Sequence, residues 1–108
     1  MSTVKGTISA GACGFVTEVT AVCEDGQQVS FEISTPCEKI RALAGALPVV
    51  DAFAEMRTGV DGAIISAARN VIPGCCAGCV IPAGLSKAMQ VAAGLALPQT
   101  VTMSFDKQ

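Results

Sequence analysis

Apolar and polar residues alternate with the period of a β-strand through most of the first third of the chain. The alternation predicts strands over residues 3–11 (TVKGTISAG), 15–23 (FVTEVTAVC) and 28–34 (QVSFEIS). Asp25 and Gly26 lie between the second and third segments and are typical of a tight hairpin turn. Three successive antiparallel strands are therefore expected. The residues predicted to face inward are Val4, Gly6, Ile8, Ala10, Phe15, Val19, Ala21, Cys23, Val29, Phe31 and Ile33.

The next segment changes to a helical pattern. In STPCEKIRALAGAL, residues 34–47, Thr35 is the predicted N-cap, Pro36 takes the first helical position, and Glu38 completes a capping box. Two shorter helices are expected over residues 49–57 and 62–70, around a TGVDG loop.

A fourth helix is predicted over residues 82–94 (PAGLSKAMQVAAG), with Gly94 near its C-terminal end. Residues 100–105 (TVTMSF) alternate again, which predicts a last strand with Val101, Met103 and Phe105 facing inward. The order of elements indicates an α+β fold. We expect an antiparallel sheet of three to four strands with helices packed on one face, and a single domain over residues 1–108.

Composition and charge exclude several classes of function. The 108 residues are 51% hydrophobic but only 4% aromatic, so aliphatic side chains must build the core. The net charge of −2 and the absence of a lysine or arginine run argue against nucleic-acid binding. No signal peptide and no apolar stretch of about 20 residues is found, which predicts a cytoplasmic protein without a membrane span. The composition is compatible with a homodimer.

The chain contains six cysteines and no histidine. Nucleophilic pairs of serine or cysteine with histidine are therefore impossible, as are zinc sites that use imidazole. A bound metal must be held by thiolates, carboxylates, backbone groups or an outside ligand. No residue set makes up a complete active site, so the sequence leaves open whether the protein is an enzyme.

Two isolated cysteines occupy positions that suit ligands. Cys37 would be the second residue of its helix, where free backbone N–H groups and the helix dipole favour a thiolate. Cys13 lies in a loop between Gly11 and Gly14, and glycine permits close approach of the backbone to a bound group.

The remaining cysteines differ in what they predict. Cys76 and Cys79 form a C-x-x-C pair, whose spacing allows both sulfurs to reach one metal ion or each other. Cys75 is adjacent to Cys76 and is expected to point away from it. Cys23 has the inward phase of its strand, and a buried core residue is expected there.

The three cysteine segments together resemble iron–sulfur cluster assembly scaffolds of the IscU/NifU type. Residues 11–35 (GACGFVTEVTAVCEDGQQVSFEIST) resemble the first segment of that family and offer Cys13. TPCEKIRALAGAL resembles the second and offers Cys37, and CVIPAGLSKAMQVAAG resembles the third and offers Cys79. The chain is also similar to short uncharacterised cysteine-containing proteins of anaerobes.

The resemblance implies an IscU/NifU-like domain in which Cys13, Cys37 and Cys79 converge at one end of the sheet. Those scaffolds often have a histidine beside the third cysteine; Gly78 stands there, and Cys76 would supply a fourth ligand. Four thiolates suit zinc and an iron–sulfur cluster equally. The predicted function is a metal or cluster scaffold or carrier, with a protein donor or acceptor as partner.

Two alternatives remain open at the level of sequence. The CAGC motif, Cys76 to Cys79, could cycle between dithiol and disulfide in a redox protein. A non-enzymatic interaction module with purely structural cysteines would also be compatible with the composition.

Overall fold

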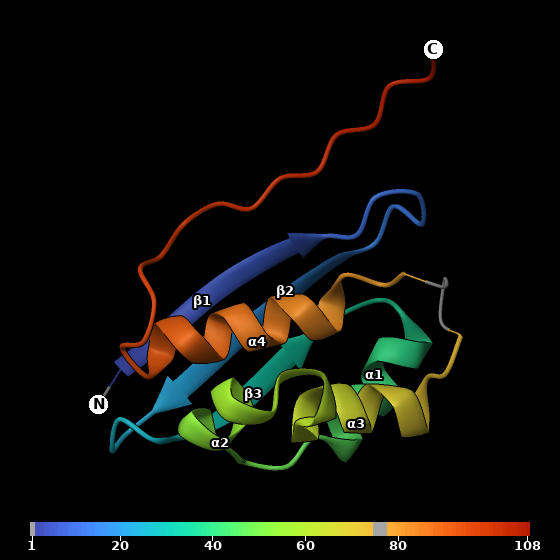
Figure 1. The fold of residues 1–108 in the computed structure, drawn as a ribbon. Helices are drawn as coiled ribbons and strands as arrows, with labels where there is room; N and C mark the ends of the chain where they lie inside the picture. Colours follow the sequence, from blue (N-terminus) through green and yellow to red (C-terminus); the bar gives the residue numbers. More distant parts are fainter. Residues whose placement is uncertain (1, 75–77) are drawn as a thin grey trace.

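A computed structural model describes residues 2–74 and 78–108 of the chain. In this part of the chain, four antiparallel strands form one sheet in the order β1-β2-β3-β4 (Figure 1). The strands are β1 (Ser2–Ser9), β2 (Val16–Cys23), β3 (Gln28–Ser34) and the very short β4 (Val50–Asp51). The predicted α+β class and antiparallel sheet are therefore confirmed.

The described residues also form four α-helices and one turn of 3₁₀-helix. They are α1 (Glu38–Ala46), α2 (Ala52–Thr58), the 3₁₀ turn η1 (Gly59–Asp61), α3 (Ala63–Val71) and α4 (Ile81–Ala92). None of these helices is long and apolar enough to cross a bilayer. Helix α4 packs on β1 and β2, α1 packs on β3, and α3 contacts both of these helices.

The alternation read from the sequence matches the burial of the strands except at Phe15, which lies before β2 and is 40% exposed. In β2, Val19, Ala21 and Cys23 are buried, whereas Thr20 and Val22 between them are only half-buried. The register places Ala21 opposite Val4 of β1 and Phe31 of β3, so apolar side chains of three strands share the inner face. Because consecutive side chains of a strand point to opposite faces, one face is left for the helices and the other for solvent.

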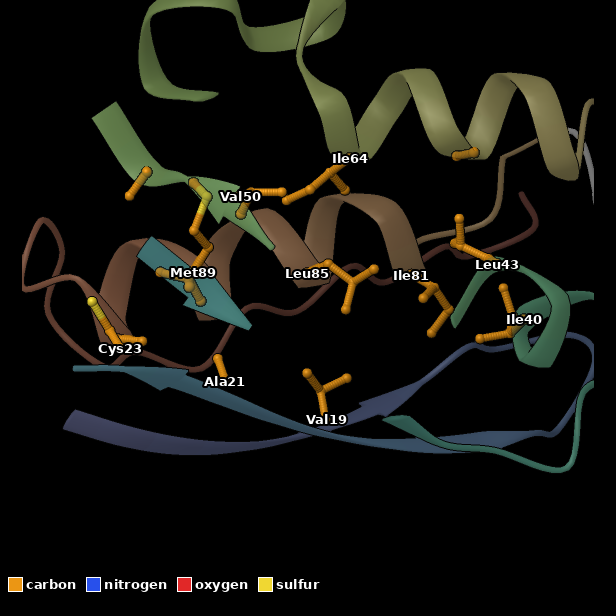
Figure 2. Packing of buried hydrophobic residues seen from close by; sticks show 14 of the residues in the cluster. Val19, Ala21, Cys23, Ile40, Leu43, Val50, Ile64, Ile81, Leu85 and Met89 are labelled. Atoms are coloured by element: carbon orange, nitrogen blue, oxygen red, sulfur yellow. The ribbon is translucent and has the colours of Figure 1, made fainter. Parts of the chain in front are cut away.

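The core lies between the inner face of the sheet and the helices. Helix α4 contributes Ile81, Leu85 and Met89, which recur at helical spacing and are at most 1% exposed. Figure 2 shows Ile81 and Leu85 on the side of α4 that faces Val19, and Met89 belongs to the same buried cluster. Ile64 of α3, with Ile40 and Leu43 of α1, closes the far side of the same cluster. The core is almost wholly aliphatic, as the composition indicates.

The predicted capping box at the start of α1 is wrong. The helix begins at Glu38, and its N-cap is Cys37 rather than Thr35. The Thr35 hydroxyl instead accepts a hydrogen bond from the Cys37 N–H at 3.2 Å and lies 2.8 Å from the hydroxyl of Thr17. This turn uses the same Thr35 oxygen that would otherwise cap the helix. The hydrogen bond between Thr35 and Thr17 of β2 favours the turn over the cap.

The predicted last strand is also wrong. Residues 100–105 form no strand, and Val101, Met103 and Phe105 are 60%, 64% and 88% exposed. The fourth strand comes instead from Val50–Asp51, within a segment whose pattern predicted only a helix. Alternation shows that a segment can serve as a strand, but a strand forms only where a neighbouring backbone pairs with it.

Carboxylates cap the two middle helices. The Asp51 Oδ1 atom accepts hydrogen bonds from the N–H groups of Phe53 and Ala54 at 2.9 and 3.1 Å, at the start of α2. The Glu55 carboxylate of α2 accepts from the N–H groups of Ala63 and Ile64 at 2.7 and 2.9 Å, at the start of α3. Each of these helices therefore has two of its free N–H donors met by a charged oxygen.

The Asp51 cap predicts a loss of stability in acid. The Gln27 side-chain amide, which donates to Oδ2 at 2.7 Å, and the Ala54 N–H hold the pKa of Asp51 below its ordinary value of 3.8. Because the folded pKa is lowered, the stabilisation is complete above the unfolded pKa and is lost as the pH falls through the folded value. Urea unfolding between about pH 6 and pH 2 should show this decline below about pH 4.

Asp51→Asn provides the control, because asparagine keeps an acceptor for the cap but does not titrate. Its free energy of unfolding should fall less steeply with acid than that of the unmodified protein. Parallel curves for the two proteins would mean that Asp51 does not contribute to the acid dependence.

Candidate functional site

A pocket of about 480 Å³ opens at the end of the sheet where the β1–β2 loop meets the N-terminal ends of α1 and α4. Three of its lining residues are the cysteines Cys13, Cys37 and Cys79. The apolar lining consists of Ala10, Phe15, Pro36, Ile40 and Ile81, and the polar lining of Thr17, Glu38 and Lys39. Three thiols separated by long stretches of sequence therefore share one pocket.

Cys13 is carried by the tight loop between β1 and β2. Gly11 and Gly14 both adopt positive φ, at 85° and 74°, a conformation that favours glycine. The Gly14 N–H donates to the carbonyl of Gly11 at 2.9 Å, and the Ala10 N–H donates to the carbonyl of Phe15 at 3.1 Å. The two glycines thus turn the chain and hold the exposed Cys13 at the rim of the pocket.

Cys37 is half-buried and lies directly before the first turn of α1. The sequence predicted it as the second helical residue, but it is the N-cap, with extended backbone angles of φ −79° and ψ 119°. Its backbone carbonyl accepts the first helical hydrogen bond, from the Arg41 N–H at 3.0 Å. The thiol remains at the positive end of the helix dipole, which the prediction required.

Cys79 is half-buried and packs against the core just before α4. Val80 is the N-cap of that helix, and Pro82 lies in its first turn. The other member of the C-x-x-C pair, Cys76, lies outside the described residues, as does Cys75. Cys23 is buried in the core away from the pocket, which confirms its structural interpretation.

The two helices that begin at the pocket differ from the other two in their capping. Neither Cys37 nor Val80 supplies a side-chain hydrogen bond to its own helix. Helices α2 and α3, by contrast, receive carboxylate oxygens from Asp51 and Glu55. The N-terminal ends of α1 and α4 therefore carry N–H donors that neither cap residue meets with a side chain, a local environment that favours negative charge.

Comparison with known proteins places the chain in a family. The profile of DUF6951, described as a family of unknown function, matches residues 4–105. The chain belongs to this family. The match runs from β1 to the exposed C-terminal segment and takes in the whole pocket. No curated protein and no solved structure matches the chain.

The three thiols of the DUF6951 pocket do not form a closed ligand set. Among residues 2–74 and 78–108, no three histidine, cysteine, aspartate or glutamate side chains lie close enough together to hold a metal ion. The thiols surround a space larger than one ion requires. A group held by all three thiols would have to fill that space or draw the rim inward.

The structure adds pocket residues that sequence patterns did not indicate as functional. Thr17 is a buried polar residue of β2, and its hydroxyl pairs with that of Thr35, which orders the chain directly before Cys37. The sequence signal for Thr17 was its position in the alternation, which places its side chain on the inner face of the strand. Lys39 brings a positive charge to the pocket wall, and nothing in its local sequence distinguishes it from a solvated lysine.

Proposed function

We propose that the DUF6951 protein binds a metal ion or an iron–sulfur cluster through Cys13, Cys37 and Cys79, as a scaffold or carrier. The observation that carries the proposal is their meeting in one pocket, although 24 and 42 residues separate them along the chain. Thiolates are the ligands that zinc and iron–sulfur clusters prefer. In the absence of histidine, they are also the soft ligands that this chain can offer.

The electrostatics of the pocket support the proposal. A thiolate-ligated centre concentrates negative charge, and cysteine binds metal only after losing its proton. The N-terminal ends of α1 and α4 and the Lys39 side chain supply positive potential at this place, and the Glu38 carboxylate in the same lining offsets part of it. Cys37 stands at the first of these helix ends and Cys79 one residue before the N-cap of the second, so a negatively charged centre bound by both would lie beside two helix N-termini.

The unequal exposure of the thiols suits a group that is taken up and passed on. Cys37 and Cys79 are half-buried beside the core, whereas Cys13 is exposed on its loop. The loop would let Cys13 close on a bound group and release it to a protein partner. The resemblance of the three cysteine segments to IscU/NifU-type scaffolds points to the same role, and Cys76 would be a fourth ligand.

Anaerobic purification followed by metal and acid-labile sulfide analysis tests the proposal. We expect the protein to retain, or to take up on reconstitution, about one zinc ion or one cluster per chain. The triple variant Cys13→Ser, Cys37→Ser, Cys79→Ser should bind neither. An unmodified protein without bound zinc or iron, and without affinity for either, would contradict the proposal.

A further inference from the structure

We propose that residues 100–105 bind as an added β-strand along the free edge of β1 in a second copy of the chain. Two copies would exchange these segments reciprocally and form a symmetric dimer. The inference is independent of the cysteine pocket, which lies on other residues.

The C-terminal segment has the properties of a strand that lacks a neighbour. Val101, Met103 and Phe105 alternate with Thr100, Thr102 and Ser104, which gives one apolar and one polar face. All three apolar side chains are largely exposed. Figure 1 shows the segment leaving the end of α4 and extending clear of the sheet and helices. The alternation that predicted an inward-facing strand is thus present, but no backbone pairs with the segment within the single copy.

The acceptor surface is the outer edge of β1. This strand is eight residues long, stands at the end of the sheet order and pairs on one side with β2. A long edge strand presents a row of unpaired backbone donors and acceptors, which is a template for another strand. A six-residue strand spans about 20 Å, which is shorter than the edge that β1 offers.

The burial of the inner face indicates that the β1 edge is incompletely covered. Val19 and Ala21 of β2 are buried, but Val4 and Ile8 of β1, on the same face, are only half-buried. A strand added beside β1 with its apolar face inward would continue this surface. Val101, Met103 and Phe105 would then cover the exposed sides of Val4 and Ile8, and five strands would share the inner face of each sheet.

A second copy is the occupant that the chain itself supports. The strand-forming segment and the free edge occur on the same molecule, so a two-fold axis satisfies both at once. The family profile extends to residue 105 and therefore covers the segment. An exchange of this kind buries exposed apolar side chains on both copies.

Sedimentation equilibrium of the full chain tests the proposal. We expect a mass twice the 10.9 kDa of one chain at micromolar concentration. Met103→Asp places a charge on the apolar face of the segment and should weaken the dimer by at least about tenfold. The matched control Thr102→Asp places the same charge on the polar face and should leave association within about threefold. Neither residue belongs to the core, so both variants should fold.

Hydrogen exchange identifies the edge that is used. Alternate amides of β1 point away from β2 and should exchange slowly in the dimer but rapidly in Met103→Asp. A monomer at several hundred micromolar would overturn the proposal, even if it protected these amides, because the segment would then pair within its own chain. A dimer that survives Met103→Asp, or whose β1 amides are unprotected, would also overturn it.

Discussion

Replacing Cys37 with serine is expected to lower the affinity of the protein for zinc or for a cluster by more than about a hundredfold. Loss of an outer-shell partner alone costs about 10- to 100-fold in metal affinity, and removal of a direct ligand costs more. Cys37 stands at the N-cap of α1, at the positive end of the helix dipole. A serine hydroxyl at the same place neither ionises at neutral pH nor provides a soft ligand.

The same substitution should not harm the fold. Serine is among the preferred N-cap residues, and Cys37 makes no side-chain cap of its own. The free energy of unfolding of the metal-free variant, measured by urea titration, should therefore be unchanged or higher by about 0.5 to 1 kcal/mol. A loss of metal in Cys37→Ser would then reflect the missing thiolate and not an unfolded protein.

Cys23→Ala is the matched control for cysteine loss. Cys23 is buried at the far end of β2, about 20 Å along the strand from Thr17 in the pocket. Its replacement should lower the free energy of unfolding by about 1 kcal/mol and leave metal content unchanged. If Cys37→Ser retained full affinity, or if Cys23→Ala lost as much as Cys37→Ser, the pocket would not be the binding site.

Replacing Leu85 with alanine is expected to lower the free energy of unfolding by about 3 to 5 kcal/mol. Leu85 is fully buried in the middle of α4, between Ile81 and Met89, and faces the sheet (Figure 2). Its loss removes apolar contacts in the layer between strands and helices and leaves a cavity that a close-packed core fills only in part. Because small domains have only about 5 to 15 kcal/mol of stability, this is a large share of the total.

Leu97→Ala makes the same chemical change on an exposed residue. Leu97 is 79% exposed in the segment after α4, so its truncation should change the free energy of unfolding by less than about 0.5 kcal/mol. Urea unfolding of both variants at one pH provides the comparison. Equal effects of the two substitutions would mean that α4 does not form the centre of the core.

Most of the local structure could be predicted from the sequence because its signals are local. The alternation around Val19 and Ala21 reports which side chains a strand buries, and the spacing of Leu85 and Met89 reports the buried side of a helix. The prediction failed at Thr35, whose hydroxyl is held by Thr17 of β2, and at Val50–Asp51, where pairing with β3 makes a strand of two residues. In both cases a distant segment decided the outcome.

The candidate site also combines features that could be predicted from the sequence with features that depend on the tertiary structure. The glycines around Cys13 and the helix that follows Cys37 are local features, and both occur as expected at the pocket. The participation of Thr17 and Lys39 depends on which elements meet at one end of the sheet. No spacing along the chain could indicate it.

By itself, the sequence determined the α+β class, the inward face of β2, the presence of the helix that becomes α4, and a chemistry limited to ligands other than imidazole. Only the tertiary structure decided that Cys13, Cys37 and Cys79 line one pocket and that residues 100–105 lack a partner strand within one copy. The physical reason is range: periodicity and turn chemistry act over a few residues, whereas pockets and strand pairs are made by segments that meet only when the core forms.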